Sequence, residues 1–206
     1  LVDRLTVHET RFFRDPRALD FFQNYCLPRI AQPGGAGLQI WSAGCSTGEE
    51  PYSLAMLIDR YLENNGGGYF GITATDISLV SLAAGKRAIF SERKLKDLDE
   101  PLKESYLTKL ENGHYQVAEK LRKRICFAQM NILEAAKTPI GNMDVIYCQN
   151  LLIYFDQDKR AEILDGMVKH LKPGGILILG PGEVIEWHNS ELTRVTETTV
   201  LAYRRM

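Results

Sequence analysis

The stretch that decides the fold is Leu38-Gln39-Ile40-Trp41-Ser42-Ala43-Gly44-Cys45-Ser46-Thr47-Gly48-Glu49-Glu50-Pro51. Residues 38–43 have the apolar character of a buried strand, and the apolar residues that follow Pro51 recur at helical spacing. Gly44 and Gly48 bracket the turn between the two elements, where glycine permits unusual backbone angles and the close approach of a ligand. Such a turn lies at the carboxyl edge of an open α/β sheet, where ligands bind. The stretch therefore predicts a strand–loop–helix unit with a ligand site in its loop.

The remaining sequence continues this alternation of strands and helices. We expect helices that begin at Asp15-Pro16, near Ser78 and at Asp156, and strands at 69–75, 125–129, 143–148, 176–179 and 198–204. The order predicts an α/β fold, with a mostly parallel sheet covered by helices on both faces. Residues 98–124 break the rhythm and contain Asn112-Gly113, which predicts a small β-rich insertion with a compact two-residue hairpin turn.

Composition narrows the class of protein. The 206 residues suffice for one domain with an insertion, and 25 Lys and Arg against 26 Asp and Glu argue against nucleic acid as a partner. The basic run at 120–124 is either a docking patch or a solvated face. No apolar stretch is long enough to insert into a membrane. The four cysteines form no C-x-x-C pair, so we predict no metal and a cytoplasmic location.

Acidic residues follow the first two strands. The G-x-x-x-G loop differs from the G-x-G-x-x-G pattern that binds pyrophosphate, and Glu49 and Glu50 would repel a phosphate but attract a cationic ligand such as S-adenosylmethionine. Alternatively, both are first-turn acids that complement the helix dipole. Asp76 ends the second strand, where an acid accepts hydrogen bonds from ribose hydroxyls. The alternative is that Asp76 or Ser78 caps the next helix.

The fourth strand ends at Cys148-Gln149-Asn150-Leu151-Leu152-Ile153-Tyr154-Phe155. Methyltransferases that act on amino groups often carry Asn-Pro-Pro-Tyr at this point. Both prolines are absent here, which disfavours methylation of nitrogen. Tyr154 is either a site residue or an aromatic residue of the core.

Together these features resemble the CheR family of chemotaxis receptor methyltransferases. The T-x-F-F-R string at 10–14 and the S-T-G-E-E-P-Y-S string at 46–53 are specific to it, and the similarity extends over 8–15, 41–53, 74–77, 150–155 and 171–175. The resemblance implies a class I S-adenosylmethionine-dependent methyltransferase with a seven-stranded, Rossmann-like sheet and an antiparallel insertion at 98–128. The helical domain with which the family begins is missing, so Leu1–Met206 would be the catalytic domain.

The resemblance also implies roles for individual residues. Glu50 would bind the methionine ammonium, Asp76 the ribose hydroxyls, and Arg14 and Tyr154 would flank the transferred methyl group as catalytic residues. The cofactor-binding positions would be His8, Thr10, Arg14, Gly44, Glu50, Asp76, Asn131, Ile132, Gln149 and Asn150. The family usually has Asn where this chain has His8, and Arg where it has Gln149.

The implied reaction is methyl transfer to glutamate side chains on the methylation helices of chemoreceptors, with S-adenosylhomocysteine as product. A glutamate with a pKa of about 4.3 is already ionised at neutral pH, so no general base is needed. Positioning alone contributes roughly 7–11 kcal/mol. Two other possibilities remain open: a methyltransferase of the same fold with another acceptor, and a catalytically silent domain that senses the cofactor.

Some family members grip a C-terminal receptor peptide by strand addition to the insertion. Here the corresponding region, 106–127, looks short and its turn looks tight. We therefore expect no dependence on such a peptide, and direct recognition of the methylation helices. Lys120, Arg122, Lys123 and Arg124 would face acidic helices of the receptor.

Overall fold

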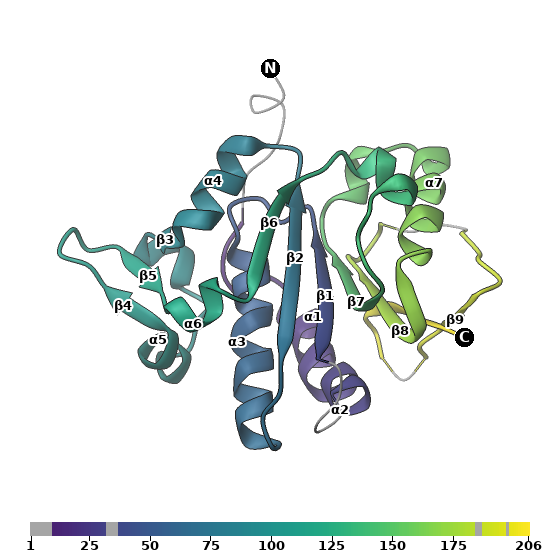
Figure 1. Ribbon diagram of the computed structural model, residues 1–206. Helices are drawn as coiled ribbons and strands as arrows, with labels where there is room; N and C mark the ends of the chain where they lie inside the picture. Colours follow the sequence, from purple (N-terminus) through teal and green to yellow (C-terminus); the bar gives the residue numbers. More distant parts are fainter. Residues whose placement is uncertain (1–9, 32–36, 184–186, 197) are drawn as a thin grey trace.

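The computed structural model describes residues 10–31, 37–183, 187–196 and 198–206. Its centre is a seven-stranded sheet in the order β6-β2-β1-β7-β8-β10-β9 (Figure 1). The strands are β1 (Leu38–Ala43), β2 (Phe70–Asp76), β6 (Ile125–Gln129), β7 (Met143–Cys148), β8 (Leu171–Leu179), β9 (Leu192–Arg194) and β10 (Leu201–Arg205). β6, β2, β1, β7 and β8 run parallel, whereas β10 is antiparallel to β8 and β9. The predicted α/β fold with a mostly parallel sheet is confirmed.

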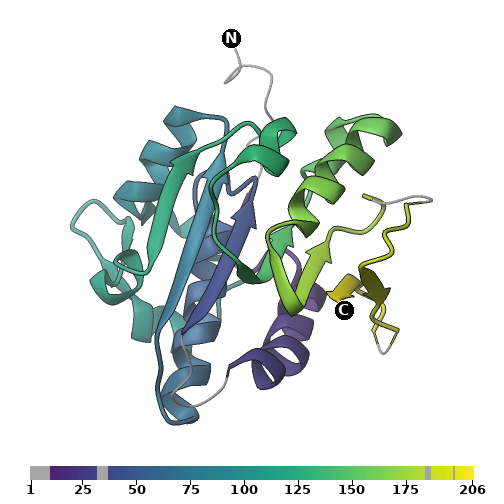
Figure 2. The same ribbon diagram turned by 45° about the vertical axis from the view of Figure 1, so that its right-hand side comes forward.

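Successive side chains along each strand point to opposite faces of the sheet, and they pack into two hydrophobic cores, one on each face. Ile40 packs into the core beneath α1 (Pro16–Phe21), the π-helical turn η2 (Phe22–Cys26), α2 (Leu27–Ile30), α3 (Glu49–Asn64) and α4 (Leu79–Arg87). Its neighbour Trp41 packs into the core beneath the 3-10 helix η4 (Ile132–Lys137) and α7 (Gln157–Val168). Figure 2 shows α7 on one side of the sheet and α1, α2 and α3 on the other.

Local sequence signals explain where the helices begin. Asp15 caps α1 by accepting hydrogen bonds from the N–H groups of Arg17 and Ala18, and proline occupies the first helical position. Asp156 caps α7 in the same way through the N–H of Lys159. Both predicted helix starts are therefore confirmed.

The carboxyl-terminal part of the sheet departs from the predicted strands. β8 begins at Leu171, so the expected strand at 176–179 is only its second half, and Lys172-Pro173-Gly174-Gly175 lies inside the strand. A register shift between Met143 and Val145 of β7 accommodates this irregular stretch. β9 has three residues and was not predicted.

A second, three-stranded antiparallel sheet lies beside α3 (Figure 1). Its order is β3 (Ile89–Phe90), β5 (Tyr115–Val117) and β4 (Leu107–Lys109), with the 3-10 helix η3 (Glu92–Leu95), α5 (Glu100–Tyr106) and α6 (Glu119–Arg122) between and after the strands. The expected bounds of the insertion, 98–128, differ from this sheet at both ends. Its first strand already begins at Ile89, and residues 125–129 belong to β6 of the main sheet.

The hairpin between β4 and β5 has a different turn from the expected one. The Leu110 N–H donates to His114 O at 2.7 Å and the Gly113 N–H donates to Leu110 O at 3.0 Å. Gly113 has φ 77°, whereas Glu111 and Asn112 are not among the residues with positive φ. The prediction of a two-residue turn was wrong, because the two-residue type I′ turn needs positive φ at both central residues. The loop has three residues, with glycine at the left-handed third position.

The basic run at 120–124 makes contacts within the chain. Lys120 Nζ lies 2.7 Å from Asp59 Oδ2 and 2.9 Å from Glu63 Oε1, both on α3. Lys123 pairs with Glu119, and the Arg124 guanidinium lies 4.3 Å from the ring centroid of Tyr69. Lys120 thus ties α6 to α3, which leaves less positive charge for a partner than the sequence suggested.

Candidate functional site

The loop after β1 is shaped by its glycines. Gly44 and Gly48 have φ of 78° and 96°, a region that side chains disfavour. The N–H groups of Gly44 and Cys45 donate to Thr75 O at 2.8 and 2.9 Å, which holds the loop against the end of β2. A Cβ at Gly44 would lie 3.1 Å from Leu151 Cδ2. The loops after β1 and β7 therefore approach each other at the carboxyl edge of the sheet.

The two glutamates of the first turn of α3 occupy different environments. Glu49 has no exposed surface, and its carboxylate accepts from Thr47 Oγ1 and pairs with Lys94 Nζ at 3.0 Å. Glu50 lines the pocket and accepts a hydrogen bond from Ser42 Oγ of β1 at 2.6 Å. Glu49 thus has a structural role within the chain, and Glu50 is the acid that a ligand would meet.

Glu50 has an unusual protonation equilibrium. Burial raises the pKa of its carboxyl to about 8, and the negative charge of Glu183 adds to the rise. The hydrogen bond from Ser42 and the positive charge of Arg14 act in the opposite direction. A cation placed against Glu50 would stabilise the ionised form, so this position favours a positively charged ligand group.

Asp76, the last residue of β2, binds the backbone of both adjoining loops. Its Oδ2 accepts from the Ser46 N–H at 2.8 Å and its Oδ1 from the Ser78 N–H at 2.9 Å. The cap of α4 is Ser78, whose Oγ accepts from the Ser81 N–H. Of the two expected capping residues, Ser78 therefore caps the helix, and the half-buried Asp76 carboxylate lies beside the loop after β1.

Residues 10–14 are held over the site by contacts from three other elements, β3, η3 and α3. Phe12 is fully buried against Phe90, with ring centroids 4.9 Å apart, and its N–H donates to Lys94 O. The Phe13 N–H donates to Ser53 Oγ of α3 at 3.1 Å, and Lys94 Nζ donates to Thr10 O. These contacts place the exposed Arg14 at the rim of the pocket.

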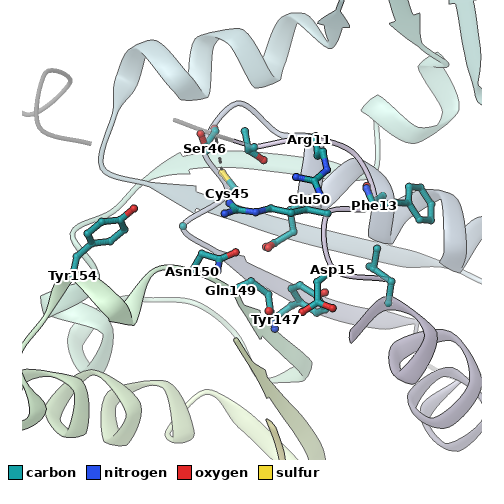
Figure 3. A pocket seen from close by; sticks show the side chains of 15 residues that line it. Arg11, Phe13, Asp15, Cys45, Ser46, Glu50, Tyr147, Gln149, Asn150 and Tyr154 are labelled. Atoms are coloured by element: carbon teal, nitrogen blue, oxygen red, sulfur yellow. Dashed lines mark hydrogen bonds between the residues drawn. The ribbon is translucent and has the colours of Figure 1, made fainter. Parts of the chain in front are cut away.

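The loop after β7 supplies the opposite wall. Gln149 is 9% exposed, and neither its amide nitrogen nor its amide oxygen has a hydrogen-bond partner among the described residues. Asn150 has φ 57°, and the 3-10 helix η5 (Leu152–Tyr154) follows it. Tyr154 is 57% exposed, so it is not a core aromatic. Figure 3 shows Tyr154 at one end of the pocket, far from Phe13 and Asp15.

The structure brings most of the predicted site residues together. One pocket at the carboxyl edge is lined by seven of them: Thr10, Arg14, Gly44, Glu50, Gln149, Asn150 and Tyr154. Asp76 is joined to it through the Ser46 backbone. Asn131 and Ile132 do not line this pocket, but the Met130 N–H donates to Asp76 O, which places them beside Asp76. His8 lies outside the described residues. In the part of the chain that the structure describes, no group of acidic, His or Cys side chains could hold a metal ion.

Sequence reasoning missed several residues of the site. Ser42 bonds Glu50, Lys94 holds residues 10–14, and the fully buried Glu183 accepts from the N–H groups of Leu151 and Leu152. Glu183 follows the carboxyl end of β8 in Gly180-Pro181-Gly182-Glu183. Asp76 ends its strand, whereas Glu183 lies four residues beyond the end of β8, so the same rule did not select it.

Comparison with known proteins gives one family. The sequence model described as "CheR methyltransferase, SAM binding domain" matches residues 8–201. A chemotaxis protein methyltransferase of Borreliella burgdorferi is 34% identical over 190 residues, which cover 90% of this chain and 67% of that protein. Chemotaxis protein methyltransferase 2 of Vibrio cholerae is 36% identical over 89% of this chain and 64% of that protein. The chain therefore spans about two thirds of the length of these relatives.

Solved structures agree on the fold. Magnesium protoporphyrin IX methyltransferase from Synechocystis, determined with bound S-adenosylmethionine, aligns with a TM-score of 0.50 and 15% identity. The alignment covers 91% of this chain and 78% of that one. At this level of sequence identity the structural similarity supports the class I methyltransferase fold and gives no information about the methyl acceptor.

Proposed function

Because the chain belongs to the CheR methyltransferase family, we propose that it transfers methyl groups from S-adenosylmethionine to glutamate carboxylates of chemoreceptors. The observation that carries this proposal is the pocket that combines Glu50 with the partnerless amide of Gln149 at the carboxyl edge of the sheet. In the part of the chain that the structure describes, no helix is both long and apolar enough to cross a bilayer.

The residues present fit the cofactor. S-adenosylmethionine supplies an electrophilic sulfonium methyl group, and it also carries an ammonium, a carboxylate and two ribose hydroxyls. Glu50 would bind the ammonium, whose charge offsets the unfavourable burial of the carboxylate. The Gln149 amide offers a donor and an acceptor that have no partner of their own among the described residues, which is costly unless a ligand satisfies them. Asp76 would accept from the ribose hydroxyls.

The chain's own chemistry suits a carboxylate acceptor. An ionised glutamate needs no base, and the described pocket contains no prepared nucleophile, since burial raises the pKa of the Cys45 thiol and of the Tyr147 hydroxyl above their usual ranges. Arg14, at the rim, would orient the incoming anion by charge-assisted hydrogen bonds. Tyr154, which is exposed, would donate a hydrogen bond beside the methyl path.

The product separates this function from its alternatives. A carboxyl methyl ester releases methanol in mild base, whereas an N-methyl product does not. We expect label from the cofactor methyl group to be released as volatile methanol after receptor fragments have been incubated with the chain. Stable label would indicate another acceptor, and an absence of transfer with retained cofactor binding would indicate a silent sensor.

We also propose that recognition does not depend on a C-terminal receptor peptide. Strand addition requires an edge with several free main-chain groups. β4, an edge of the small sheet, has three residues, and its loop is closed by the bonds between Leu110, Gly113 and His114. The expected contribution of the basic run is reduced, because Lys120 is already paired with Asp59 and Glu63. The receptor would instead be recognised through its methylation helices.

Calorimetry with the C-terminal peptides of the organism's own receptors tests this proposal. We expect no saturable binding at peptide concentrations up to about 100 μM. A specific docking site would have a dissociation constant far below this concentration. Micromolar binding that maps to residues 106–127 would overturn it.

A further inference from the structure

Glu183 joins the carboxyl ends of two neighbouring strands. Its Oε1 accepts from the N–H groups of Leu151 and Leu152 at 2.7 and 3.0 Å, and its Oε2 accepts from the Gly180 N–H at 2.6 Å. The first two groups belong to the loop after β7, and Gly180 directly follows β8. The residue has no exposed surface. A single buried carboxylate therefore holds the loop that carries Gln149, Asn150 and Tyr154.

A carboxylate is the group that this position requires. Three N–H donors converge on it, and only an ionised carboxyl presents acceptors on both oxygens. A glutamine amide has one acceptor oxygen, so its NH₂ would face either Gly180 or the Leu151–Leu152 pair as a second donor. The position therefore distinguishes glutamate from its closest isostere.

The neighbouring contacts leave little room for another arrangement. A Cβ on Gly180 would lie 2.7 Å from Glu183 Oε2, so glycine is needed for the carboxylate to reach its position. Arg160 of α7 donates from Nε to Phe155 O at 2.8 Å, which fixes the far end of the same loop. Asn150, between these anchors, has φ 57°, which costs backbone energy that the anchors must offset.

We propose that Glu183 is a positioning residue for methyl transfer, which holds Gln149, Asn150 and Tyr154 in place through the Leu151 and Leu152 amides. The expected effect on methyl transfer rests on the proposed function, whereas the expected effect on the Leu151 and Leu152 amides does not. Glu183 does not line the pocket, so it acts through the loop rather than by contact with ligands. A displacement of catalytic groups by about 1 Å lowers rates by roughly 100-fold, so small shifts of this loop should be visible in turnover.

The test compares E183Q and G180A with E162Q, a matched change of the exposed Glu162 on α7. E183Q removes one acceptor, and G180A displaces the carboxylate while keeping its charge. We expect both to lower single-turnover methyl transfer by about tenfold or more, and by more than they change affinity for S-adenosylhomocysteine, which the displaced Gln149 can also alter. Combining E183Q with Y154F should slow the reaction little beyond Y154F alone, because both act on the same group.

Hydrogen exchange of the ligand-free protein gives a readout that does not need activity. The Leu151 and Leu152 amides should be protected in the wild type and lose protection by about tenfold or more in E183Q. Wild-type turnover in both variants, or effects of E183Q and Y154F that multiply fully, would overturn the proposal. If the wild type itself does not methylate receptors, the proposed function fails, and the exchange result alone decides: unchanged protection overturns the role of Glu183, and lost protection supports it.

Discussion

Glu49 and Glu50 are adjacent in the chain, yet one is bound inward and the other faces the pocket. Glu49 is fully buried and pairs with Lys94 Nζ at 3.0 Å, whereas Glu50 accepts from Ser42 Oγ and lines the pocket. Lys94 also donates to Thr10 O, so the inward glutamate anchors the segment that carries Arg14. The two residues therefore have different roles. Glu49 helps to hold residues 10–14 in place, and Glu50 is positioned to contact a ligand.

We predict that Lys94→Met lowers the free energy of unfolding by about 3 kcal/mol, because it leaves the buried Glu49 carboxylate without its cation. The double variant Glu49→Gln/Lys94→Met should recover part of this loss, since no buried charge is then left unpaired. Urea denaturation measures both. Lys159→Met, which removes an exposed pair with Glu162, should change stability by less than about 0.5 kcal/mol. Equal losses for Lys94→Met and Lys159→Met would contradict the structural role of Glu49.

Cofactor affinity should depend on pH through Glu50. Its pKa is raised to about 8 in the free protein, so the carboxyl is mostly protonated at pH 6 to 7. A bound ammonium requires the ionised form, and binding must therefore release a proton in this range. Affinity for S-adenosylhomocysteine should rise by up to about tenfold per pH unit between pH 6 and 7.5. Calorimetry in two buffers of different ionisation enthalpy measures the proton release directly.

The matched variant for this prediction is Glu50→Gln, which keeps the shape and removes the titration. Its affinity should be weaker at pH 7.5 and nearly independent of pH. The same substitution should stabilise the ligand-free protein at neutral pH. The raised pKa means that ionised Glu50 is disfavoured in the folded state, so its contribution to stability is lost as pH rises from about 4.5 towards 8. A wild-type pH profile in Glu50→Gln would assign the titration to another group.

Asp76 should contribute to binding through the ribose. Losing hydrogen bonds to a charged acceptor costs about 1.5–3 kcal/mol each at most, so Asp76→Ala should weaken binding of S-adenosylhomocysteine by about tenfold or more. Part of this effect would come from the Ser46 and Ser78 amides that Asp76 also binds. An analogue of S-adenosylhomocysteine that lacks the 2′- and 3′-hydroxyls separates the two contributions. Asp158→Ala, at an exposed position of α7, is the control, and wild-type affinity in Asp76→Ala would remove this assignment.

Arg14 and Tyr154 should affect chemistry more than binding. Arg14→Ala and Tyr154→Phe each remove a polar group that lines the pocket. We expect single-turnover rates to fall by about tenfold or more, and by more than cofactor affinity falls. Arg14→Ala should also weaken binding somewhat, because the Arg14 charge lowers the pKa of Glu50. Wild-type rates in both variants would show that these residues have no part in the reaction.

Much of the fold could be predicted because the buried parallel strands carry mostly apolar runs. β1, β6 and β7 have the bounds that the apolar pattern predicted. The expected strand at 176–179 was too short, because Pro173, Gly174 and Gly175 are residues typical of a turn, and an irregular pairing with β7 accommodates them within β8. The prediction of the hairpin turn was wrong for a related reason. Asn-Gly is compatible with both two-residue and three-residue hairpin loops, and the choice between them depends on the register of the strands rather than on the Asn-Gly dipeptide.

The site was predictable where residues lie at the carboxyl ends of strands or in the elements that follow them. Glu50, Asp76 and Gln149 are placed by the carboxyl ends of β1, β2 and β7, and strand order brings those ends together. The separate tasks of Glu49 and Glu50 could not be predicted. They depend on Lys94, which lies 45 positions away in the chain and reaches Glu49 only after the small sheet has packed on α3.

The most direct test of the proposed function is transfer of labelled methyl groups onto purified receptor signalling fragments. Each fragment is compared with a partner in which the acceptor glutamates are changed to glutamine, and label is measured as methanol released in mild base. The proposed function predicts base-labile label on the wild-type fragment, its loss in the glutamine variant, and its slower appearance with the Tyr154→Phe enzyme. Label that persists in the glutamine variant, or that resists base, would contradict glutamate methylation by this chain.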